Sequence, residues 1–120
     1  MKLRAYTSCA ALVGMAVTSG CANQPNTLYY WGDYQNQVHD YLNASDGGDI
    51  QKQTAALEAG VEKAKASGKG LPPGYHAQLG MLYYAQGMPD QAAEQLQLEK
   101  SIYPESATYI DGLLTKFKKN

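Results

Sequence analysis

The sequence is poor in the features that most nucleic-acid, membrane-spanning and disulfide-stabilised proteins need. It has 120 residues, a formal net charge of −1 and only two cysteines, Cys9 and Cys21. The balanced charge gives no basic face of the kind that attracts nucleic acid, so no such partner is expected. No apolar run approaches the ~20 residues that a helix needs to span a bilayer. No stretch alternates polar and apolar residues over any length, so strands are not expected either.

Candidates for catalysis are also few. An enzyme needs a nucleophile, a base or a metal held in a pocket, but His39 and His76 fall on different predicted helices without an obvious Ser or Cys nucleophile motif. We interpret His39, next to Asp40, as a solvated pair and His76 as part of a seam between helices. The segment 46–49 lacks the alternating oxygen ligands of an EF-hand and is interpreted as a turn and helix cap. We therefore predict no enzyme activity, no metal site and no cofactor.

The first twenty residues have the pattern of a secretory signal. Lys2 and Arg4 give a positive start, Ala10–Val17 form a short apolar run, and residues 18–20 are small. A small residue directly before Cys21, after such a run, resembles the lipobox of bacterial lipoproteins. The resemblance implies cleavage before Cys21, a diacylglycerol on its thiol and an acyl chain, such as palmitate, on the new amino group. An ordinary cleaved signal and an uncleaved membrane helix are the alternatives.

Cleavage before Cys21 would change both the cysteine content and the net charge of the mature protein. Cys9 would leave with the signal, so no internal disulfide and no cysteine-based metal cage could form. Loss of Lys2 and Arg4 would lower the formal charge from −1 to −3. Residues 21–27, which are polar and include a proline, would be a tether for one domain at 28–120. In lipoproteins an aspartate after the lipidated cysteine usually marks retention in the inner membrane, so Ala22 implies the outer membrane and its periplasmic face.

Apolar residues recur at steps of three and four along the rest of the chain, which is the spacing of one helix face. We expect the second helix to begin at a cap on Asp49 and to end at Gly68. The third and fourth should cover about 73–85 and 89–103, and Ser106 should cap the fifth. The expected face of the first helix carries Trp31, Tyr34, Val38, Tyr41 and Leu42. The sequence thus predicts an all-α protein of about five antiparallel helices.

The third and fourth predicted helices resemble a tetratricopeptide repeat, a two-helix unit of about 34 residues. The positions that match the repeat are Leu79, Gly80, Tyr83, Gly87, Ala92, Leu96 and Pro104. Gly80 and Ala92 would let the two helices approach closely, while Pro104 would turn the chain. Glu99 stands where a small residue is usual, which predicts a locally loosened seam. The first two helices would be a degenerate repeat, with Gly32 equivalent to Gly80, and the fifth would be a closing cap.

The start of the predicted domain adds a second resemblance. The run Tyr-Tyr-Trp-Gly-x-Tyr at 29–34, preceded by Cys21 and followed by the repeat around Gly80, resembles small lipoproteins of Gram-negative bacteria in the domain-of-unknown-function family numbered 4810. Members are commonly encoded beside a pore-forming lipoprotein of the curli-secretion type. The resemblance therefore implies a protein partner that is itself a lipoprotein, but it implies no activity and leaves the oligomeric state open.

Binding is the function that the side chains favour. The repeat register places Met81 and Tyr84 on a concave side, where an apolar groove would accept a partner segment, although both could instead pack against neighbouring helices. Tyr30 and Trp31 belong to the densest aromatic cluster, which fits a core, a protein partner or a cell-wall sugar. We therefore expect a lipid-anchored, non-catalytic adaptor. A cell-wall or glycan-binding lipoprotein is the alternative, and a hydrolase is third.

Overall fold

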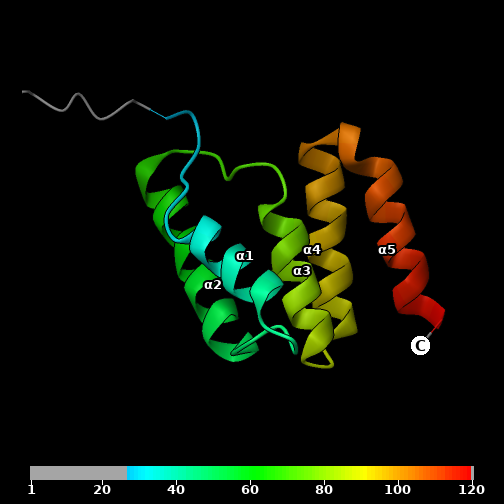
Figure 1. Cartoon of the computed structure of the whole chain (residues 1–120). Helices are drawn as coiled ribbons and strands as arrows, with labels where there is room; N and C mark the ends of the chain where they lie inside the picture. Colours follow the sequence, from blue (N-terminus) through cyan, green and yellow to red (C-terminus); the bar gives the residue numbers. More distant parts are fainter. Residues whose placement is uncertain (1–26, 120) are drawn as a thin grey trace, which may run out of the picture.

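The computed structural model describes residues 27–119, and these form a stack of five α-helices (Figure 1). The helices are α1 (Tyr34–Asn43), α2 (Ile50–Ser67), α3 (Tyr75–Ala85), α4 (Pro89–Ile102) and α5 (Ala107–Lys119), with one 3-10 turn, η1 (Pro104–Ser106), before α5. Within this part of the chain the only β-type pairing is an isolated parallel bridge between Tyr29 and Gly70. The all-α prediction is therefore confirmed.

Local signals explain where α2 begins and ends. The Asp49 side chain accepts a hydrogen bond from the backbone N–H of Lys52 at 3.0 Å, which satisfies one of the free donors of the first turn. Gly68 ends the helix in the left-handed conformation, with φ at 65°, which glycine adopts without a steric penalty. Both ends lie where the sequence predicted them.

The predicted start of the first helix was wrong. Helix α1 begins at Tyr34, so Trp31 lies in the segment before it and not on the helix face. Gly32 has φ at +47°, and a Cβ there would lie 2.6 Å from the Tyr30 ring, so this glycine makes a turn and is not equivalent to Gly80. Helix α5 begins directly after Ser106, where the sequence placed its start, and the Ser106 hydroxyl donates to the carbonyl of Tyr103 at 2.7 Å within η1.

The pair α3 and α4 is the closest in the stack. A Cβ on Gly80 would lie 3.1 Å from the carbonyl oxygen of Ala92 and 3.1 Å from Cγ of Leu96. Ala92 and Leu96 are both fully buried. The missing side chain at Gly80 thus sets the distance between the helices, as the sequence predicted.

Helix α3 lies in the middle of the fold and is buried on most sides, as Figure 1 shows. Its residues Tyr75, Leu79 and Leu82 form one core with Leu57 of α2, against which side chains of α1 also pack. Its Ala77 joins a second core with Leu96 of α4 and Ile110 of α5. Because α3 belongs to both cores, the helices on either side of it are coupled through its packing.

The prediction of a loosened seam at Glu99 was wrong. The side chain is 1% exposed, and its Oε1 accepts the backbone N–H of Gly74, at the start of α3, at 2.6 Å. A hydrogen bond at a site of this kind is costly to leave unmade, because a buried donor without a partner loses its contact with water. Glu99 therefore connects α4 to the start of α3. The second oxygen, Oε2, has no hydrogen-bond partner among the described residues.

Three tyrosine hydroxyls donate hydrogen bonds to other parts of the fold. Tyr75 donates to the carbonyl of Leu57 at 2.8 Å, Tyr83 donates to Glu58 at 2.5 Å, and Tyr103 donates to the carbonyl of Leu71. Burial is the main cause that raises the pKa of each of the three phenols to about 12. In each of them the folded protein favours the neutral phenol, because ionisation would place a charge in a poorly hydrated site.

We expect the stability of the protein to fall steeply between about pH 10 and pH 12. Unfolded tyrosines ionise near pH 10, whereas Tyr75, Tyr83 and Tyr103 ionise at about 12 in the fold, so the unfolded state loses protons first. Their contribution is fully present below pH 10 and is lost as the pH rises through 12. Thermal unfolding midpoints across this window, with the ultraviolet absorbance of tyrosinate, measure the effect. Tyr75→Phe should flatten the decline and the exposed control Tyr109→Phe should not; a constant midpoint would contradict the expectation.

Candidate functional site

The segment before α1 is attached to the stack by aromatic contacts. The Tyr30 N–H donates to the carbonyl of Gly70 at 2.8 Å, beside the Tyr29–Gly70 bridge. The Tyr29 ring lies 6.4 Å from the rings of Tyr103 and Trp31, both at steep angles. Such aromatic pairs each contribute roughly 0.5–1.5 kcal/mol beyond their buried area. The segment is therefore a fixed part of the domain surface.

The aromatic cluster is half core and half surface. Tyr34 lies 5.0 Å from the buried ring of Tyr75, measured between ring centroids, and 6.3 Å from the ring of Trp31. Burial, followed by the charge of Glu99, raises the pKa of Tyr34. Trp31 itself remains 38% exposed, and Leu28 is 80% exposed. Of the predicted partner-binding residues in this segment, Tyr30 is thus half-buried and Trp31 faces solvent in part.

Met81 and Tyr84 contact α5. The Tyr84 ring stacks on Phe117 with 3.7 Å between centroids and 4° between planes. The Tyr109 hydroxyl approaches the sulfur of Met81 at 3.9 Å. These contacts correspond to the alternative in which the two side chains pack against a neighbouring helix. A shallow hollow of about 500 Å³ remains beside Tyr84 and Phe117.

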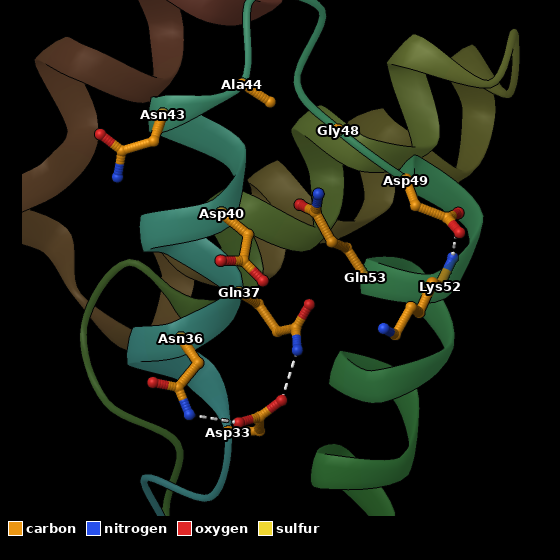
Figure 2. Close-up of a pocket in the computed structure, with 10 residues that line it drawn as sticks. All are labelled: Asp33, Asn36, Gln37, Asp40, Asn43, Ala44, Gly48, Asp49, Lys52 and Gln53. Atoms are coloured by element: carbon orange, nitrogen blue, oxygen red, sulfur yellow. Dashed lines mark hydrogen bonds between the residues drawn. The ribbon is translucent and has the colours of Figure 1, made fainter.

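A polar pocket of about 590 Å³ lies between α1 and the first turns of α2 (Figure 2). Its lining combines three carboxylates, four amides and one lysine, together with a small loop segment. The lining residues are Asp33, Asn36, Gln37, Asp40, Asn43, Ala44, Gly48, Asp49, Lys52 and Gln53. No histidine, serine or cysteine is among them, so the pocket offers groups for hydrogen bonding but no evident nucleophile.

Hydrogen bonds within this pocket fix the positions of its groups. Asp33 accepts from the side-chain amides of Asn36, at 2.6 Å, and of Gln37, and these two hydrogen bonds, in that order, lower its pKa. Gln53 is buried, and its Nε2 donates to the carbonyl of Gly47 at 2.7 Å. Its Oε1 has no donor among the described residues. An unpaired acceptor thus lies buried in the wall of the pocket, while the exposed carboxylates and amides are the groups that a ligand would meet.

A second hollow, of about 420 Å³, runs between α2 and α4, and we call it the α2/α4 groove. It is lined by Val61, Ala64, Lys65, Lys69, Leu71, His76, Glu94, Gln95 and Leu98. His76 is buried at this groove, and its Nδ1 lies 2.8 Å from Oε1 of Gln95. Leu98 is 39% exposed. The groove thus combines apolar walls with charged side chains, two of them lysines.

The histidines lie where the sequence placed them. His39 is exposed, with Nδ1 3.5 Å from Asp40, as expected of a solvated pair. His76 is held between helices, as expected of a seam residue. Within residues 27–119 no group of three or more His, Cys, Asp or Glu side chains is arranged to hold a metal ion.

The sequence did not predict the α2/α4 groove or the pocket around Gln53. The groove is built by helices that are not consecutive, so no local spacing shows it. In the sequence, Gln53 falls on the same helix face as Ile50 and Leu57, and this polar residue on an apolar face was the available signal for the pocket. Cys21, the predicted lipidation site, lies outside the described residues. Among the described helices, none has both the length and the apolar character needed to cross a membrane.

Comparison with protein-family models finds a match. The model of the family described as "Domain of unknown function (DUF4810)" matches residues 28–113, which is most of the chain. No curated protein and no solved structure shows a significant match.

Proposed function

The chain belongs to the DUF4810 family, a domain of unknown function, and we propose that it is a lipid-anchored, non-catalytic adaptor at the periplasmic face of the outer membrane. The observation that carries this proposal is the α2/α4 groove. Its walls include Val61, Leu71 and the partly exposed Leu98, and Lys65 and Lys69 lie beside them. A groove of this kind suits a partner segment that brings an apolar side chain for the walls and a carboxylate for the lysines.

The position of the groove supports a partner at the membrane. Lys69 and Leu71, which line the groove, flank Gly70, and Gly70 is bonded to the segment that continues the proposed tether. A partner in the groove would therefore lie close to the anchored end of the domain. This arrangement favours a partner that is itself held at the membrane. The resemblance noted in the sequence gives one candidate, a pore-forming lipoprotein of the curli-secretion type.

The anchor part of the proposal depends on Cys21 and the signal-like residues before it. The short apolar run, the small residues and the cysteine follow the order expected of a lipoprotein signal. The intact mass of the protein purified from membranes should correspond to a chain that starts at Cys21 and carries acyl chains. A Cys21→Ser variant should lack that mass and leave the membrane fraction. A membrane-bound Cys21→Ser variant would contradict lipid anchoring.

Crosslinking in cells tests the adaptor role. A photoreactive residue at Leu98 should give a defined adduct with one membrane-held protein. Leu42, an exposed apolar residue on α1 outside the groove, is the matched control and should give no such adduct. Lys69→Glu should reduce the Leu98 adduct about tenfold or more, because reversing one charge at a close contact commonly changes binding by over ~1.4 kcal/mol. Equal adducts from both positions, or none from Leu98 in the lipidated protein, would contradict the proposal.

The polar pocket between α1 and α2 favours one alternative, a cell-wall or glycan-binding lipoprotein. Carboxylates and amides such as Asp40 and Gln53 are the groups that bind hydroxyl-rich and amide-rich ligands. If this alternative holds, isolated peptidoglycan should retain the wild-type protein, and Asp40→Ala should reduce retention. No retention of the wild-type protein would exclude it.

A further inference from the structure

We propose that the end of the domain that carries Leu28 and Trp31 inserts into the headgroup region of the membrane that holds the lipid anchor. The proposal rests on the lipid anchor at Cys21 proposed above. It concerns a different surface from the α2/α4 groove. It assigns a lipid surface as the ligand of Leu28 and Trp31, two exposed apolar side chains at this end.

The first observation is exposure. Leu28 is 80% exposed and Trp31 is 38% exposed, and both lie in the short segment that precedes α1. A single exposed apolar residue is ordinary in a folded protein. Here the pair includes tryptophan, whose amphipathic ring favours the interface between headgroups and acyl chains.

The second observation is rigidity. Tyr29, between these two residues, is held by its bridge to Gly70 and by ring contacts with Tyr103 and Trp31. The segment therefore presents Leu28 and Trp31 from a fixed base. Insertion would not first require the segment to become ordered, which lowers its entropic cost.

The third observation is the reach of the chain outside the described residues. Thr27 lies six positions after Cys21, and a fully extended chain spans at most about 3.6 Å per residue, so the reach is about 20 Å. A tether this short keeps Leu28 at an effective concentration on the order of millimolar or higher relative to the bilayer surface. Even a weak affinity of two side chains for the interface is then enough to hold them there.

The arrangement of the helices agrees with this orientation. The described chain starts at the end of the stack where α2 joins α3 and α4 joins α5 (Figure 1). The basic last turn of α5, with Lys116, Lys118 and Lys119, is at the opposite end. The lysines of the last turn of α5 thus lie away from the anchored end, whereas Lys65 and Lys69 lie close to it. Burial of Leu28 and Trp31 is the expected driving force of insertion, and the two nearby lysines would add attraction to anionic lipid.

Trp31 is the single tryptophan of the sequence, so its fluorescence reports on this surface alone. The natively lipidated protein would be placed in vesicles of phosphatidylethanolamine and phosphatidylglycerol, with and without lipids brominated near the headgroup. We expect brominated lipid to quench Trp31 about twofold or more, and aqueous acrylamide to quench it less than in the soluble Cys21→Ser protein. The double variant Trp31→Phe, Leu42→Trp moves the probe to the far end of α1 and should reverse both results.

The outcomes are separable by mass spectrometry on the same sample. If Cys21 carries lipid and Trp31 is quenched by acrylamide but not by brominated lipid, the surface does not insert and this inference alone is wrong. Protection of Trp31 from both quenchers would show that protein covers it, which also overturns the inference. If Cys21 carries no lipid, the proposed anchor is wrong and the inference falls with it.

Discussion

Gly60→Ala should lower the free energy of unfolding by about 2–4 kcal/mol, although alanine normally stabilises the middle of a helix. A Cβ at this position of α2 would overlap the hydroxyl of Tyr75 and lie 3.2 Å from its Cζ. The Tyr75 side chain is buried and cannot retreat without losing the hydrogen bond to the carbonyl of Leu57. The cost therefore combines overpacking with a disrupted buried hydrogen bond.

Gly112→Ala is the matched control, because it makes the same change within α5. A Cβ at Gly112 would have no neighbour within 4 Å, so the substitution should raise stability by about 0.5–1 kcal/mol. Urea unfolding of both variants measures the expected loss and the expected gain in the free energy of unfolding in one series. Tyr75→Phe removes the overlapping oxygen, so it should cost less in the Gly60→Ala background than in the wild type. A Gly60→Ala protein as stable as the wild type would show that α2 and α3 can separate without cost.

Glu99→Ala should destabilise the protein by about 2–3 kcal/mol. The substitution removes the carboxylate that accepts the Gly74 N–H at 2.6 Å, and hydrogen bonds to charged groups contribute roughly 1.5–3 kcal/mol. It also leaves a space at a position that is almost fully buried. The amide proton of Gly74 should lose its protection from hydrogen exchange in the same variant. Thermal or urea unfolding, together with exchange at this one amide, measures both effects.

Two further variants separate geometry from charge at this position. Glu99→Gln keeps an acceptor oxygen of the same shape, so it should preserve most of the Gly74 protection and lose less stability than the alanine variant. Glu94→Ala, on the exposed side of the same helix, should stay within about 0.5 kcal/mol of the wild type. A Glu99→Ala protein with wild-type stability and a protected Gly74 amide would contradict the expected link between α4 and α3.

The sequence predicted those parts of the fold that local chemistry decides. Asp49 and Gly68 were sufficient to place the ends of α2, because a cap acts within three or four residues of itself. Gly80 was sufficient to predict a close helix pair. The start of α1 was wrong because Trp31 continues the apolar spacing, whereas Gly32 turns the chain there for contacts with Tyr30.

Contacts between distant parts of the chain could not be predicted at the candidate site. The prediction at Glu99 was wrong because the group that it binds, the backbone N–H of Gly74, lies 25 residues away, and glycine has no side chain that would indicate the contact in the sequence. The repeat register placed Met81 and Tyr84 but could not show their contacts with α5, and their role in partner binding stays a prediction. The α2/α4 groove needs both helices in place before it exists. These features depend on tertiary packing, which overrides local pattern.

The connection at Tyr29 and Gly70 also determines how the domain responds to force. With the proposed N-terminal anchor, a load applied through it would enter the described part of the chain at residues 27–29. That load would reach the α2–α3 loop through Gly70 and the end of α4 through Tyr103, before it reached α1. The load would thus be shared among three parts of the stack, and α1 would not be the first element to separate from it.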